Sequence, residues 1–144
     1  MASSARNDPY GAFNFTVEIE GITVAGFSEC SGLDSETVVV EYREGNDLAG
    51  VRKIPGLTKY SSIRLKRGLT KNRELWQWRK TVIDGNPSRR NGAIVLLGGD
   101  RTPVARWTFS NGWPAKLEGP HLKATADEVA VETLEIAHEG LEME

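Results

Sequence analysis

Apolar and polar residues alternate along much of the chain, with the period of two that is typical of strands with one buried face. The alternation is clearest at 13–19, where a phenylalanine or an aliphatic residue stands at every second position between Asn, Thr and Glu. The same pattern, or a run of β-branched and apolar residues, recurs further along: 22–27, 37–42, 63–66, 93–97, 104–109 and 129–136. We therefore expect at least six strands.

The last of these segments changes phase partway along. Its apolar residues stand at positions 129 and 131 and then at 134 and 136, so the two pairs lie on opposite sides of an extended chain. This change predicts either a β-bulge near Glu132 and Thr133 or a single strand that serves two packing layers.

One segment, 71–84, has the pattern of an amphipathic helix, with Thr70 placed to cap its start and Gly85 placed to end it. Its apolar residues fall on one side at 100° per residue: Leu75, Trp76, Trp78, Val82 and Ile83. Both tryptophans are expected to anchor the helix in the core. The sequence thus predicts a mainly β fold, an antiparallel sandwich or small barrel with one packed helix, in a single domain over 1–144.

The stretch 43–57 departs from these patterns, because its glycines and Pro55 stand among charged residues. If it is a loop, it exposes Val51, Ile54 and Leu57, and it is long for a connection within a compact domain. Two interpretations remain open at this point: an ordinary flexible loop, or an extended arm that docks on a neighbouring subunit.

Charge is distributed unevenly, although the net charge is only −2. Residues 1–42 hold one basic and seven acidic residues, 43–90 hold thirteen and four, and 91–144 hold four and nine. Such blocks can meet within one molecule, or they can form opposite faces that orient copies of the chain. Residues 1–9 are polar, which predicts a flexible or interface segment and no signal peptide, and the single Cys30 fits synthesis in a reducing cytoplasm.

Candidate chemistry is sparse. His121 and His138 have no metal-ligand spacing, and Cys30 has no His close by in sequence. Glu132 and Glu135 stand three residues apart on a predicted strand, so they face opposite sides and are expected to be solvated. We expect no catalytic residue, metal or cofactor, no membrane insertion, and hence no enzyme.

Basic residues in the middle of the chain offer another hypothesis, a nucleic-acid patch beside Trp76. Its members would be Arg64, Lys66, Arg67, Arg89 and Arg90. The alternative to an assembling subunit is therefore a monomeric β-sandwich module that binds a ligand or nucleic acid, with binding that weakens steeply as salt rises.

Several short segments stand together in an order that resembles one known family. They are Ala25–Asp34, Val40–Gly45, Lys53–Tyr60, Ile63–Thr70, Leu75–Trp78, Gly112–Lys116, Gly119–Pro120 and Val129–Glu135. Over roughly 10–142 the chain is similar to the tail tube proteins of contractile phages and the inner tube subunits of extracellular contractile injection systems, relatives of the type VI secretion tube.

This resemblance implies a structural subunit that forms six-membered rings, stacked into a hollow conduit with a continuous β-barrel around its lumen. Its partners would be further copies of itself, a sheath protein, baseplate and spike proteins, and a cargo protein or DNA in the lumen. The stretch 43–57 would then be an arm between subunits, with the following candidate interface residues: Arg43, Glu44, Asp47, Val51, Arg52, Lys53, Ile54, Pro55 and Leu57. Glu18 and Glu20 share the polar face of one strand and are candidates to line the lumen.

Overall fold

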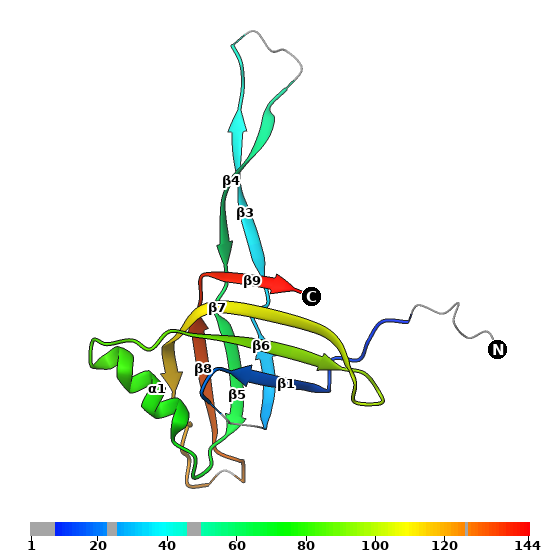
Figure 1. Cartoon of the computed structure of the whole chain (residues 1–144). Coiled ribbons are helices and arrows are strands. Elements are labelled where there is room, and N and C mark those ends of the chain that lie inside the picture. Colours follow the sequence, from blue (N-terminus) through cyan, green and yellow to red (C-terminus); the bar gives the residue numbers. More distant parts are fainter. Residues whose placement is uncertain (1–7, 23–25, 46–49, 126) are drawn as a thin grey trace, which may run out of the picture.

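The computed structural model describes residues 8–22, 26–45, 50–125 and 127–144. Within these residues the chain forms mostly strands, with one helix (Figure 1). The strands are β1 (Phe15–Ile19), β2 (Phe27–Ser31), β3 (Ser35–Tyr42), β4 (Arg52–Tyr60), β5 (Ile63–Gly68), β6 (Arg90–Leu97), β7 (Pro103–Glu118), β8 (Val131–Ala137) and β9 (Gly140–Met143), and the helix is α1 (Glu74–Ile83). The predicted mainly β fold with a single helix is confirmed for the described residues.

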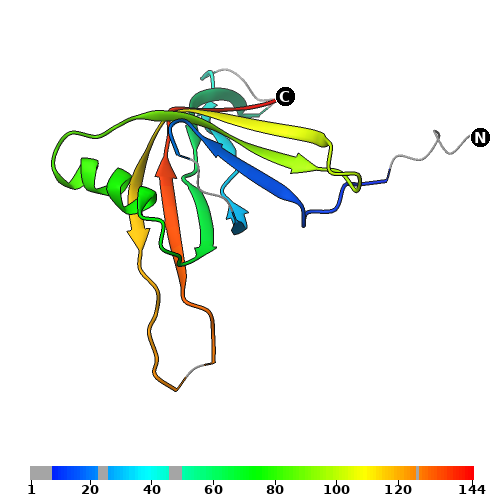
Figure 2. The same cartoon turned by 60° about the horizontal axis from the view of Figure 1, so that its bottom comes forward.

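Two layers share one long strand. The strand order is β1-β6-β7-β8-β5-β2, every pair is antiparallel, and β9 pairs with β7 outside this path. The first part of β7 pairs with β6 and β9, whereas Trp113–Glu118 pairs with β8. We call β1, β6, β9 and the first part of β7 the first layer, and β2, β5, β8 and the rest of β7 the second layer (Figure 2).

The bend between the layers lies in β7 and not in β8, where the sequence predicted a bulge. β8 pairs with β5 in unbroken register from Val131 to Ile136, whereas the register of β7 shifts between Pro114 and Lys116. A second register shift, between Arg90 and Gly92 of β6, lies opposite Asn111, which has a positive φ of 52° and whose backbone N–H donates to the side chain of Asn91. A bulge with a left-handed residue beside it turns a strand sharply.

The core lies between the two layers and α1. Its most completely buried side chains come from β5, β8, β7 and the helix: Trp78, Ile63, Leu65, Leu75, Leu134, Ile136 and Pro114. The indole N–H of Trp78 donates to the backbone oxygen of Ser88 at 2.6 Å, so its one polar group is satisfied inside. Trp76 was expected in the core as well, but its side chain is 49% exposed.

The helix begins at Glu74, three residues after the predicted start, and Thr70 does not cap it. Instead, the backbone N–H of Glu74 donates to the side chain of Asn72 at 2.8 Å, and Thr70 accepts from the N–H of Asn72. The helical end is as predicted, because Gly85 follows with a φ of 83°. In the part of the chain that the structure describes, no helix is long and apolar enough to span a membrane.

Candidate assembly surfaces

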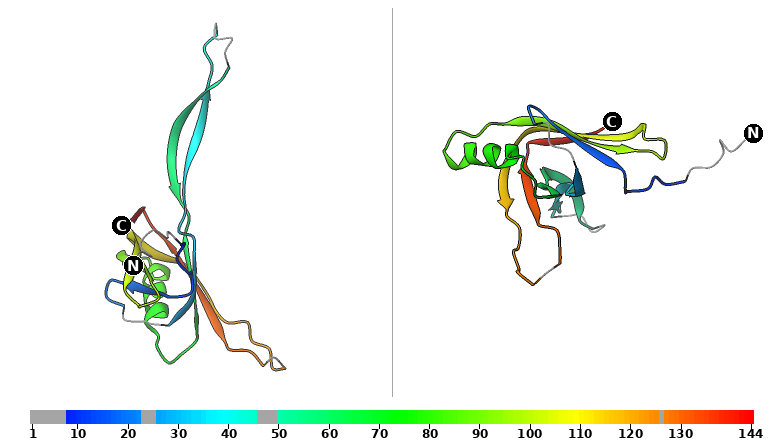
Figure 3. Two further views of the ribbon diagram at one scale, coloured as in Figure 1. Left: turned by 90° about the vertical axis from the view of Figure 1, so that its right-hand side faces the viewer. Right: turned by 90° about the horizontal axis from the view of Figure 1, so that it is seen from below.

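β3 and β4 form a two-stranded ribbon that projects from the body, and we call this ribbon the arm (Figure 3). The sequence predicted a loop over 43–57, but β4 occupies 52–60 and only 43–51 connects the two strands. Pro55 fits within β4 because the register shifts beside it and the ribbon has no further strand to receive its missing N–H. The expected arm is thus an antiparallel hairpin with one register shift, between Thr37 and Val39.

The arm has one apolar and one polar face. Strand alternation and the paired register place Val38, Val40, Tyr42 and Ile54 on one face. The opposite face carries Val39 and Pro55 together with the polar set Thr37, Glu41, Lys53 and Thr58. The hydroxyls of Thr37 and Thr58 lie 3.0 Å apart, which confirms that these two side chains share a face.

Every residue of β3 and β4 is exposed in this single chain. On the apolar face the exposed fractions are 38% for Val38, 46% for Val40, 48% for Tyr42 and 44% for Ile54. An isolated two-stranded hairpin is marginally stable in water, because it has no layer on which to bury such a face. In the described residues, no layer of the chain covers this apolar face.

The predicted interface residues fall at the far end of the arm. Arg43 and Glu44 follow β3, Val51 precedes β4, and Asp47 lies outside the described residues. The others stand on β4: Arg52, Lys53, Ile54, Pro55 and Leu57. Leu57 is 77% exposed. The structure thus brings these residues together on one projecting element.

The root of the arm is fastened to the body by His138. One ring nitrogen, Nε2, lies 3.0 Å from the backbone oxygen of Ser61, and Nδ1 lies 3.1 Å from that of Gly140. The ring centroid is also 5.7 Å from that of Tyr60, the last residue of β4. His138 therefore has a structural position, as a hydrogen-bonded residue between the arm and β9.

The outer face of the first layer is acidic. Glu18 pairs with Arg106 at 3.1 Å, and Arg106 also lies 3.9 Å from Glu144. Glu20 follows β1 and is exposed. Both predicted lumen residues border an open groove of about 1040 Å³, which Glu139 and Glu142 also line.

The outer face of the second layer carries charges of both signs. Arg64 lies 3.9 Å from Glu135, and Lys66 lies 3.7 Å from Glu29. Lys116 completes the set, at 3.3 Å from Glu118 and 3.9 Å from Glu135. Carboxylates from β2, β7 and β8 are thus interleaved with the basic residues of β5 on this face.

The predicted nucleic-acid patch does not form. Arg67 is only 3% exposed, and Arg89 pairs with Glu139 at 3.7 Å. The guanidinium of Arg90 lies over the ring of the buried Trp78, at 5.5 Å. These arginines are spread between the core and different surfaces, so they do not line one site for a phosphate backbone.

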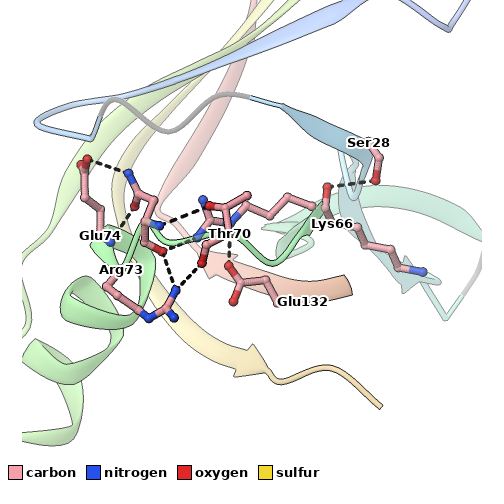
Figure 4. A network of polar contacts seen from close by, with 8 residues as sticks. Ser28, Lys66, Thr70, Arg73, Glu74 and Glu132 are labelled. Carbon is pink, nitrogen blue, oxygen red and sulfur yellow. Dashed lines mark hydrogen bonds and ion pairs between the residues drawn. The ribbon is translucent and has the colours of Figure 1, made fainter. Parts of the chain in front are cut away.

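Glu132, which was expected to be solvated, is buried and paired with Arg67. Arg67 Nε donates to Glu132 Oε1 at 2.5 Å, and its Nη2 donates to the backbone oxygen of Asn72 at 3.2 Å. Figure 4 shows Glu132 within the network that leads to Thr70, Arg73 and Glu74 at the start of the helix. This buried pair also explains the change of phase in 129–136, because a carboxylate occupies an inward position of β8.

A thiol and possible metal ligands are the remaining candidates for chemistry. Burial raises the pKa of the Cys30 thiol to about 11, which keeps it protonated and unreactive at neutral pH. Among the described residues, no three His, Cys, Asp or Glu side chains come together as a metal site. The features that the fold does present are surfaces: an arm and two charged faces.

An exposed arm on a two-layer β body favours one class of protein, a structural subunit that associates with further copies. The family model of the T4-like virus tail tube protein gp19 matches residues 11–142. The chain belongs to this family, which makes it a structural tail tube protein and a component of a virion or phage-tail-like particle. No curated protein sequence matches it.

Solved structures agree with this assignment. A chain of the sheath/tube terminator of PVC, an extracellular contractile injection system, has a TM-score of 0.88 and 26% identity, covering 97% of this chain and 99% of that chain. A chain of the PVC sheath-tube complex has a TM-score of 0.83 and 25% identity, covering 94% and 91%. A type six secretion system protein shares the fold at a TM-score of 0.56 and 11% identity, covering 90% and 82%.

Proposed function

We propose that six copies of this chain form a ring and that rings stack into the hollow inner tube of a contractile injection particle. The arm is the observation that carries this proposal, because it presents an apolar face with no layer of its own to cover it. The matched PVC chains belong to a sheath-tube complex and a tube terminator, which supports the same role.

Ring closure would use the free ends of the strand order. β1 and β2 stand at the two ends of the path β1-β6-β7-β8-β5-β2, so each offers an edge for pairing. Neighbouring copies that continue each other's sheets would close a barrel around the lumen and remove these edges. We treat 1–144 as one tail tube unit. The N-terminal segment 1–9, predicted to be flexible or part of an interface, lies outside the described residues as far as position 7.

The partners of such a tube would be a surrounding sheath protein, baseplate and spike proteins, and a cargo protein or DNA in the lumen. Assembly would take place in the cytoplasm where the chain is made. The chain would act as a passive conduit with no reaction to catalyse and no cofactor to bind. The candidate interface residues are those of 43–57 named above, with Arg52, Ile54 and Leu57 among them.

Glu18 and Glu20 remain our proposed lumen residues. They belong to the acidic outer face of the first layer, and an acidic wall would repel DNA or an acidic cargo and let it slide. The mixed charges around Lys66 on the second layer offer a competing lining.

Electron microscopy of the purified protein tests the proposal. We expect rings and short tubes in negative stain, at a yield that increases with protein concentration. A single monomeric species at high concentration would overturn the proposal. It would favour the alternative, a monomeric β-sandwich module that uses the groove beside Glu18 and Glu139 to bind a ligand.

A further inference from the structure

The arm and the connection between β7 and β8 project from opposite ends of the molecule (Figures 1 and 3). Stacking of rings is head-to-tail, so it brings one end of each copy against the other end of the next. With the arm lying along the tube axis, the arm of one copy meets a surface near the β7–β8 connection of another copy. Whichever surface receives the arm should match the chemistry of the arm's apolar face.

An apolar patch lies at that opposite end, where β5 ends and β8 begins. Gly68 pairs with Val131, and Val129 Cγ1 would lie 3.6 Å from a Cβ on Gly68, so both valines stand beside the same glycine. Val131 is 39% and Val129 is 78% exposed. We call Gly68, Val129 and Val131 the terminal patch. It continues the outer face of the second layer beyond Lys66, where the charged pairs end.

Charges around the two surfaces are complementary. Asp127 and Glu128 directly precede Val129 in the chain. On the arm, Arg52 and Lys59 stand on the same face as Val40, together with Glu36, the cross-strand partner of Lys59, so this face carries two basic residues and one acidic residue. An apolar centre with opposite charges around it favours one relative placement of two copies.

We propose that the apolar face of the arm docks on the terminal patch of a second copy in the next ring, while its polar face stays in water. The inference rests on the proposed tube and adds to it the side of the arm that is buried and the surface that receives it. Two adjacent valines point to opposite faces of the arm, so the same substitution can be compared on the two faces. Val40 belongs to the apolar face and Val39 to the polar face.

The first experiment compares Val40→Asp with Val39→Asp. We expect Val40→Asp to convert tubes into single rings, seen by sedimentation and negative stain, whereas Val39→Asp assembles as the unchanged chain does. Val129→Asp should have the same effect as Val40→Asp. All three positions are at least 46% exposed, so the monomer should fold in each case, which a thermal melt verifies. Equal loss of tubes in the two arm variants would overturn the assignment of faces.

The second experiment tests contact directly in tubes of a Cys30→Ala chain. The pair Val40→Cys and Val129→Cys should form disulfides between copies on oxidation, giving a ladder of linked chains on a non-reducing gel. In the control pair, Val39→Cys and Val129→Cys, the thiol at position 39 points away from the proposed contact, so no ladder should form. Tubes without cross-links in the first pair would overturn the proposed docking site while leaving the tube itself intact. Failure of the unchanged chain to form any tube would instead count against the proposed function.

Discussion

At the scale of single residues, the two tryptophans of the helix differ in environment although they stand two positions apart. Trp78 is 1% exposed and bonded to Ser88, whereas Trp76 is 49% exposed. Trp78→Ala should lower the free energy of unfolding by about 3–5 kcal/mol, because it leaves a large cavity. Trp76→Ala is the matched control and should change it by less than about 1 kcal/mol, as exposed substitutions do. Urea denaturation of unassembled protein measures both, and equal losses would contradict the packing described.

The buried pair of Arg67 and Glu132 predicts a different pattern of losses. Removing one partner leaves the other charge buried alone, so Arg67→Met or Glu132→Leu should each destabilise the fold by about 3–5 kcal/mol. The double variant should recover much of the loss, since neither charge then remains. A double variant that is as unstable as the sum of the single ones would show that the pair contributes through packing alone.

The alternation along β5 and β8 indicates that Arg67 and Glu132 point inward, but their charge led to the expectation of a surface position. Ile63, Leu65 and Arg67 stand at every second position, and so do Glu132, Leu134 and Ile136 on β8. The phase of each strand therefore placed both charged residues inward. A charge is normally assigned to the surface, because burial without a partner is costly, and the partner comes from a strand 65 positions away in the chain.

At the scale of elements, the strands with one buried face and the end of the helix could be predicted. The alternation of apolar residues and the stop at Gly85 depend only on residues that are close in the sequence. The start of the helix could not be predicted, because the side chain of Asn72, and not that of Thr70, accepts from the backbone N–H of Glu74. One strand of the arm was predicted, at 37–42, whereas β4 was missed because both faces of the arm are exposed here and Pro55 and Gly56 interrupt β4. An apolar face that only a second copy of the chain can cover does not follow the alternation expected around a single core. The sequence of such a segment therefore indicates a loop.

Charge reversals on the arm separate its two faces. Arg52 shares a face with Tyr42 and Val40, whereas the adjacent Lys53 is paired with Glu41 on the polar face. Arg52→Glu should reduce tube length and yield, because it places a carboxylate against the acidic surroundings of the terminal patch. Lys53→Glu should have little effect in the same assay. A stronger effect from Lys53→Glu would mean that the polar face is the one in contact.

At the scale of the whole molecule, the remaining question is which layer faces the lumen of the tube. Both outer faces are polar, as a water-filled channel requires, but the first layer is acidic around Glu18 and the second has mixed charges around Lys66. Single cysteines at these positions in a Cys30→Ala chain distinguish the layers. A bulky polymer-linked maleimide should label either cysteine in free monomers. In assembled tubes, which it enters only through the ends, it should fail to reach the residue that lines the lumen.

Our assignment predicts that Glu18→Cys is protected in tubes and that Lys66→Cys is labelled. A small maleimide, which diffuses along the channel, serves as the control and should label Glu18→Cys in both states. The reverse pattern, with protection at Lys66, would place the second layer on the channel. The arm and the terminal patch, which continue that layer at its two ends, would then form part of the channel wall, and the cargo would travel along an unbroken strip of mixed charge.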